Sequence, residues 1–110
     1  MLNVIPPSDN PQDTEIVAEA TKPFHTYLNV YFKKLPSTNP IKQMLERGVN
    51  FLDIGCGNGR LIIQLATLFT NSRFTGVESS PYGIDIARKN IEHLVSISNI
   101  YVKNSRVYIE

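Results

Sequence analysis

The chain lacks paired cysteines, an excess of either charge, and any long apolar run. Its 110 residues include one cysteine, Cys56. This excludes an internal disulfide and a cysteine-rich metal site, and it fits a reducing compartment. The 11 basic and 10 acidic residues leave a formal net charge of +1. The overall charge therefore gives no reason to expect nucleic acid or an anionic membrane as a partner.

The N-terminal end also lacks the apolar segment of a secretory signal. Residues 1–12 hold Pro6, Pro7 and Pro11, which oppose regular structure, and we expect a flexible lead there. No stretch approaches the roughly 20 apolar residues that span a bilayer. We therefore expect a cytoplasmic protein with no membrane partner.

What the chain does have is the apolar content of one small domain. Hydrophobic residues make up 42% of it, enough to bury a core. No internal repeat or low-complexity segment divides the chain. We assign residues 1–38 to the flexible lead and N-terminal helices, and residues 39–110 to the folded domain.

Helical spacing begins near Asp13, and Pro23 suggests a break between two short helices. The second helix, from Phe24 to Leu35, carries an apolar stripe. We interpret this stripe as a surface that packs on the domain; a lid that contacts substrate is the alternative.

From residue 40 onward, helical and strand-like segments alternate. Two caps followed by proline, Asn39-Pro40 and Ser80-Pro81, mark helix starts. The predicted order is helix 41–47, strand 49–54, helix 60–69, strand 73–78, helix 81–94 and strand 100–102, with a further strand-like run at 107–109. Right-handed crossovers then give a Rossmann-like, three-layer α/β/α fold with parallel strand order 3-2-1. This is the first half of a doubly wound sheet.

The most informative segment joins the first of these strands to the helix that follows it. Three glycines, Gly55, Gly57 and Gly59, stand at every second position between them. Such a loop brings backbone amides and a helix N-terminus against a nucleotide-like ligand. Glu78 ends the next strand, where a carboxylate can accept hydrogen bonds from both hydroxyls of a ribose.

The even glycine spacing and a leading carboxylate narrow the kind of ligand. A dinucleotide fingerprint places its third glycine three residues after the second, and here the interval is two. Asp53 would repel a phosphate and attract an ammonium group. A Walker loop is excluded, because no Gly-Lys-Ser/Thr follows. A tight turn that binds no ligand is the alternative to a binding loop.

The run from Asp53 to Gly59 resembles the first motif of the class I S-adenosylmethionine-dependent methyltransferases, and Gly76-Val77-Glu78 resembles the acidic end of their second strand. The resemblance covers residues 40–110. It implies S-adenosylmethionine as cofactor and identifies residues 39–110 as part of a Rossmann-like domain that binds it.

The resemblance implies a role for each residue of the motif. Asp53 would lie near the methionyl ammonium, Glu78 would hold the ribose hydroxyls, and Ser79 would lie beside the adenine. The loop residues that would line the methionine and ribose are Gly55, Cys56, Gly57 and Gly59. Cys56 stands at a variable position of the motif; we interpret it as a packed loop residue, with a reactive thiol as the alternative.

Two departures from the family pattern affect the expected function. No acidic residue follows the third strand, where Asn104 or Ser105 is the substitute for the family's adenine contact. The sequence also holds no fourth strand, so the apolar edge of strand 49–54 is expected to be unpaired. We expect a fragment, a homo-oligomer, or a chain whose partner completes the sheet.

The leading functional interpretation is a methyltransferase that transfers a methyl group to a small molecule, RNA or protein. A non-catalytic S-adenosylmethionine-binding module or inactive remnant is the first alternative, and an NAD-binding oxidoreductase is the second. We assign no catalytic residue and no metal ligand, and we expect His25 and His93 to be structural.

Overall fold

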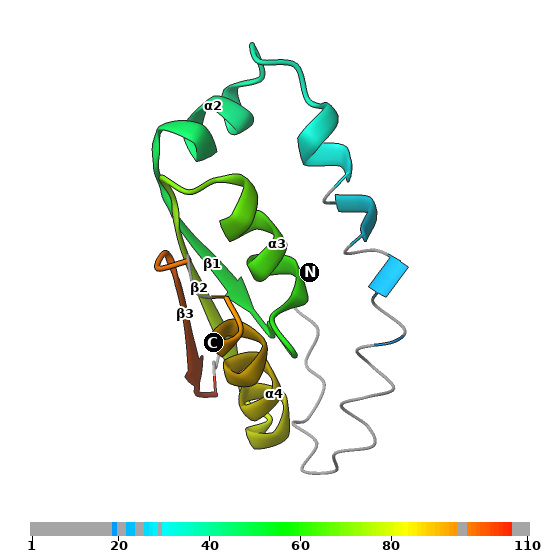
Figure 1. Cartoon of the computed structure of the whole chain (residues 1–110), viewed down its shortest axis with the longest axis vertical. Coiled ribbons are helices and arrows are strands. Elements are labelled where there is room, and N and C mark those ends of the chain that lie inside the picture. Colours follow the sequence, from blue (N-terminus) through cyan, green and yellow to red (C-terminus); the bar gives the residue numbers. More distant parts are fainter. Residues whose placement is uncertain (1–18, 20–21, 24–25, 29, 95–96, 107–110) are drawn as a thin grey trace.

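The computed structural model describes residues 19, 22–23, 26–28, 30–94 and 97–106. Its elements alternate along the chain, as Figure 1 shows. They are α2 (Pro40–Arg47), β1 (Asn50–Ile54), α3 (Arg60–Leu68), β2 (Arg73–Glu78), α4 (Pro81–Glu92) and β3 (Ile100–Asn104). Of the earlier residues, 19, 22–23, 26–28 and 30–34 are helical.

The three strands form one parallel sheet in the order β1-β2-β3, which confirms the predicted order 3-2-1. The register pairs Phe51 with Phe74 and Phe74 with Ile100. The parallel alignment brings the carboxyl ends of all three strands to one edge of the sheet. The loop after β1 and the turn after β2 therefore lie beside each other.

Helices α3 and α4 both pack on the same face of the sheet (Figure 1). The core lies between these helices and the sheet and consists of Leu45, Cys56, Ile62, Leu65, Ala66, Phe69, Phe74, Ile84, Ala87 and Val102. The strands contribute Phe74 and Val102, which point to the same face because successive residues of a strand alternate between the two faces. Phe32 of the N-terminal helical segment joins the core through an edge contact with Phe69, at 6.2 Å between ring centroids.

The local signals predicted most helix starts correctly. Asn39 caps α2 by accepting hydrogen bonds from the backbone N–H groups of Ile41 and Lys42, and Ser80 caps α4 by accepting one from Gly83. Helix α4 ends two residues earlier than predicted, at Glu92, and β3 extends two residues further, to Asn104. Lys22 and Pro23, at the predicted break, are helical, whereas residues 20–21 and 24–25 on either side of them and the strand-like run 107–109 lie outside the described residues.

The opposite face of the sheet carries no described helix, so the described residues form two of the three predicted layers. Apolar side chains are exposed on it: Leu52 is 58% exposed, Ile54 48% and Tyr101 63%. Parallel sheets are normally covered on both faces. Strand β1 also has a neighbour on one side only within this part of the chain. We call Leu52, Ile54 and Tyr101 the bare face.

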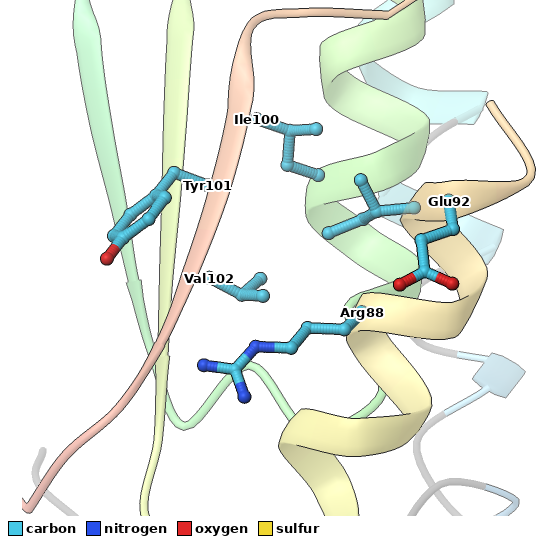
Figure 2. A pocket seen from close by; sticks show the side chains of 6 residues that line it. Arg88, Glu92, Ile100, Tyr101 and Val102 are labelled. Atoms are coloured by element: carbon cyan, nitrogen blue, oxygen red, sulfur yellow. The ribbon is translucent and has the colours of Figure 1, made fainter. Parts of the chain in front are cut away.

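An open cavity of about 250 Å³ lies between α4 and β3. Figure 2 shows Ile100 and Val102 pointing from β3 toward α4, whereas Tyr101 points to the other side of the strand. Arg88 and Glu92 line the cavity from α4. None of the residues predicted to bind a cofactor lines it.

Among the described helices, none is long and apolar enough to cross a membrane.

We expect the 110-residue chain to self-associate through the bare face and the open edge of β1. Replacing Leu52 and Ile54 together by lysine should suppress this association, because charged side chains oppose burial. Size-exclusion chromatography with light scattering, over a wide range of concentration, measures the effect. Tyr27→Lys is the control, since Tyr27 is 65% exposed but lies on the N-terminal helical segment. A wild-type chain that stays monomeric at high concentration would contradict this expectation.

Candidate functional site

The glycine loop leaves β1 in a conformation that depends on its glycines. Gly55, Gly57 and Gly59 have φ angles of 77°, 55° and 77°, in the left-handed region that other residues rarely adopt. The amides of Gly55 and Cys56 both donate to the carbonyl oxygen of Val77, at 2.7 and 3.1 Å. The loop is thereby attached to the end of β2, next to Glu78.

The surroundings of the glycines separate them into two kinds. A Cβ added to Gly55 or Gly57 would meet no atom within 4 Å, so open space lies over this part of the loop. A Cβ on Gly59 would instead lie 3.4 Å from the Cβ of Ala87 on α4. Gly55 and Gly57 thus border space for a ligand, whereas Gly59 is buried between the start of α3 and α4.

Glu78 connects the loop, the end of β2 and the start of α4. Its Oε1 accepts a hydrogen bond from the Gly57 amide, and its Oε2 accepts one from the Ser80 amide, both at 2.9 Å. Each carboxylate oxygen has a second lone pair, so two acceptor positions remain. The carboxylate is held in one orientation before any ligand arrives, and it can still accept two hydrogen bonds.

Asp53 is the second acidic group of the site. It lies beside Gly76 in the sheet register, on the face that α3 and α4 cover. Burial, together with the nearby Glu78 carboxylate, raises the pKa of Asp53 to about 6. No cation is among the causes of this shift, which are burial and the Glu78 carboxylate. Two neighbouring carboxylates make this edge of the sheet favourable for a cation.

Cys56 packs beneath the loop and does not face the open space. It is 4% exposed, and a Cβ on Gly76 would come within 2.7 Å of its Sγ. Burial, and to a lesser degree the two nearby carboxylates, raises the pKa of the thiol to about 12. The thiol is therefore protonated at neutral pH, and the packing interpretation fits this geometry better than a reactive thiol.

The structure brings the predicted site residues together at one edge of the sheet. Ser79 is half-buried in the turn between Glu78 and the α4 cap, and its carbonyl oxygen accepts a hydrogen bond from Asn104. His93 is exposed and follows the last residue of α4, at the far end of that helix from the loop. His25 lies outside the described residues. Within the described chain, no group of three His, Cys, Asp or Glu residues could hold a metal ion.

Sequence reasoning gave no role to Gly83, which packs against Glu78. A Cβ on Gly83 would lie 3.1 Å from the Cγ of Glu78, so a small residue in the first turn of α4 gives that side chain room. A glycine inside a predicted helix is unfavourable by itself. A glycine at an unfavourable position in a predicted helix was therefore the one sequence signal that another group packs closely against residue 83.

Comparison with known proteins identifies the family. A family model described as a methyltransferase domain matches residues 45–107, which is more than half of the chain. The chain belongs to this methyltransferase-domain family. The matched residues include all three strands and the loop after β1.

Individual relatives agree with this assignment. The chain is 31% identical to the ribosomal protein L11 methyltransferase of Thermosipho africanus over 88 residues, which cover 80% of this chain and 34% of the relative. Among solved structures, PKMT2 from Rickettsia typhi in complex with AdoHcy matches with a TM-score of 0.52 and 32% identity, over 57% of this chain and 12% of that one. The chain thus spans about a third of the curated relative's length.

A more distant structure shows the same fold. A SAM-dependent methyltransferase from Aquifex aeolicus matches 90% of this chain and 48% of its own, with a TM-score of 0.61 and 14% identity. The Rossmann-like fold predicted for the first half of a doubly wound sheet is therefore confirmed.

We expect Asp53 to lower the stability of the ligand-free protein as the pH rises. Its pKa is higher in the folded chain than the ordinary 3.8, so the folded state binds the proton more tightly. The contribution of protonated Asp53 to the free energy of unfolding is fully present below pH 4. It is lost as the pH rises through about 6, where the folded protein releases this proton. The loss amounts to at most about 3 kcal/mol, because each pKa unit corresponds to about 1.4 kcal/mol.

The isosteric variant Asp53→Asn isolates this effect from the titration of other groups. Urea unfolding of both proteins between pH 4 and pH 7 measures it. The free energy of unfolding of the wild type should fall relative to that of the variant over this interval. Parallel curves would show that Asp53 titrates normally.

Proposed function

We propose that this protein binds S-adenosylmethionine at the carboxyl ends of β1 and β2 and acts as an S-adenosylmethionine-dependent methyltransferase. The observation that carries the proposal is the Glu78 carboxylate, oriented by two backbone amides beside the open space over Gly55 and Gly57. Its two remaining acceptor positions suit the two hydroxyls of a ribose.

The charge of the site supports the same ligand. S-adenosylmethionine carries an ammonium and a sulfonium group, and Asp53 and Glu78 supply two neighbouring carboxylates at the site. A dinucleotide would bring a pyrophosphate toward these carboxylates and be repelled. The AdoHcy bound to the 32%-identical Rickettsia typhi protein also supports the assignment.

The chemistry in this proposal is in-line transfer of a methyl group from the sulfonium to a nucleophile, which leaves S-adenosylhomocysteine. Such a reaction depends on alignment and on exclusion of water. Asp53 would hold the ammonium, Glu78 the ribose, and Ser79 would lie beside the adenine. The acceptor class, whether a small molecule, RNA or protein, is tested by supplying each with radiolabelled S-adenosylmethionine.

A binding module without catalysis is the second candidate. The observation that favours it is that the residues gathered at the site, Asp53, Gly57 and Glu78, are all assigned to the cofactor and none to a methyl acceptor. Calorimetry with S-adenosylmethionine, S-adenosylhomocysteine and NAD distinguishes both candidates from an oxidoreductase. Release of S-adenosylhomocysteine in the presence of acceptors then separates the enzyme from the module.

We further propose a cytoplasmic location and a partner, either a second copy or another chain, that completes the sheet at β1. The single cysteine, kept as a buried thiol, supports a reducing compartment. The open edge of β1 and the bare face support the partner.

Glu78→Gln should weaken binding of S-adenosylhomocysteine by roughly 1–3 kcal/mol, which corresponds to about 5- to 150-fold in Kd. The variant keeps the size of the side chain but removes its charge and one acceptor oxygen. Calorimetry gives the affinity, and thermal unfolding reports how much of the loss reflects folding. Glu78→Ala removes the acceptors of both Gly57 and Ser80 and should also lower stability. An unchanged affinity in Glu78→Gln would remove the ribose assignment.

Gly57→Asn should abolish binding and change the free energy of unfolding by about 1 kcal/mol or less, because asparagine tolerates the left-handed region. Its side chain would enter the open space that the ligand needs. Gly59→Asn is the matched control, since Gly59 shares the backbone region but a Cβ there meets Ala87. The control should mainly lower stability. Equal loss of folding in both variants would favour a purely structural turn.

A further inference from the structure

Asn104, the last residue of β3, is bonded to the turn that carries Glu78. Its side-chain Nδ2 donates to the carbonyl oxygen of Glu78 at 3.0 Å and to that of Ser79 at 3.2 Å. The orientation of this amide follows from chemistry, because both partners are carbonyl oxygens that only accept hydrogen bonds. The next backbone amide, of Ser105, also donates to the Glu78 carbonyl, at 3.1 Å.

These bonds determine where the backbone lies as it leaves β2. Two residues later, the Ser80 amide donates to Oε2 of Glu78, and the Ser80 side chain caps α4. The direction of the Glu78 carboxylate therefore depends on the backbone of residues 78–80, and Asn104 holds two consecutive carbonyls of that backbone.

We propose that Asn104 is a positioning residue that fixes the Glu78 carboxylate for recognition of the ribose, and so sets the preference of the site for a ribonucleoside over a deoxyribonucleoside. The inference rests on the proposed function, in which Glu78 accepts the ribose hydroxyls. Asn104 itself does not contact the ribose in this arrangement; it acts through the Glu78–Ser80 turn.

Asn104→Asp tests the proposal with almost no change in shape. The aspartate cannot donate, and its negative charge would face two carbonyl oxygens and lie near the Glu78 carboxylate. Lys103→Ala is the control, because Lys103 is exposed and its side chain points away from α3 and α4. The full-length 110-residue chain is used throughout.

The readout is the ratio of the Kd values for the 2′-deoxy analogue of S-adenosylhomocysteine and for S-adenosylhomocysteine itself. The wild type and Lys103→Ala should prefer the ribonucleoside by about tenfold, the scale of one lost hydrogen bond to a charged group. In Asn104→Asp the ratio should fall toward one. Asn104→Gln, which restores the amide on a longer side chain, should recover part of it.

A second comparison separates positioning from general loss of structure. In a Glu78→Gln background, Asn104→Asp should leave the ratio unchanged, because its effect passes through the Glu78 carboxylate. An Asn104→Asp variant that keeps the wild-type ratio, or that changes it equally in both backgrounds, would overturn the proposal. If the wild type itself shows no preference for the ribose, or does not bind S-adenosylhomocysteine, the proposed function fails instead.

Discussion

The hydrogen bonds accepted by the Glu78 carboxylate hold the site together. One comes from the loop after β1 and the other from the amide of Ser80, the N-cap of α4, so a single side chain joins the loop to the continuous stretch from β2 to α4. The bond from Gly57 lies next to the open space over that residue, so the carboxylate is fixed at the border of this space. A carboxylate is well suited to the task, since it accepts several strong hydrogen bonds at once.

Around this connection the sheet is built asymmetrically. Its covered face holds the aromatic and aliphatic core, in which Phe74 and Val102 are buried, whereas Leu52 and Tyr101 remain exposed on the other face. The asymmetry follows from topology, because two right-handed crossovers in the same direction place both helices on one side. The covered face and its helices support the loop and Glu78. The bare face of the same sheet remains an exposed apolar surface on which a further layer could pack.

The sequence allowed much of this arrangement to be predicted, for local reasons. The glycine spacing, Asp53 and the position of Glu78 at a strand end are local signals, and the Rossmann-like pattern with right-handed crossovers then favours the order 3-2-1. The contacts of Asn104 with Glu78 were not predictable in this way, because they span 26 residues and depend on the β2–β3 register. The burial of Cys56 against Gly76 depends likewise on how the loop folds back over β2.

That contact between Cys56 and Gly76 also constrains how the protein can vary during evolution. The Sγ of Cys56 occupies the volume in which any side chain at position 76 would begin. The side chain of Ile62 on α3 lies equally close, at 2.7 Å, so the loop and the helix together fill the space above position 76. A lineage that acquires alanine at 76 therefore needs compensating changes at both 56 and 62, so glycine at 76 is expected to persist.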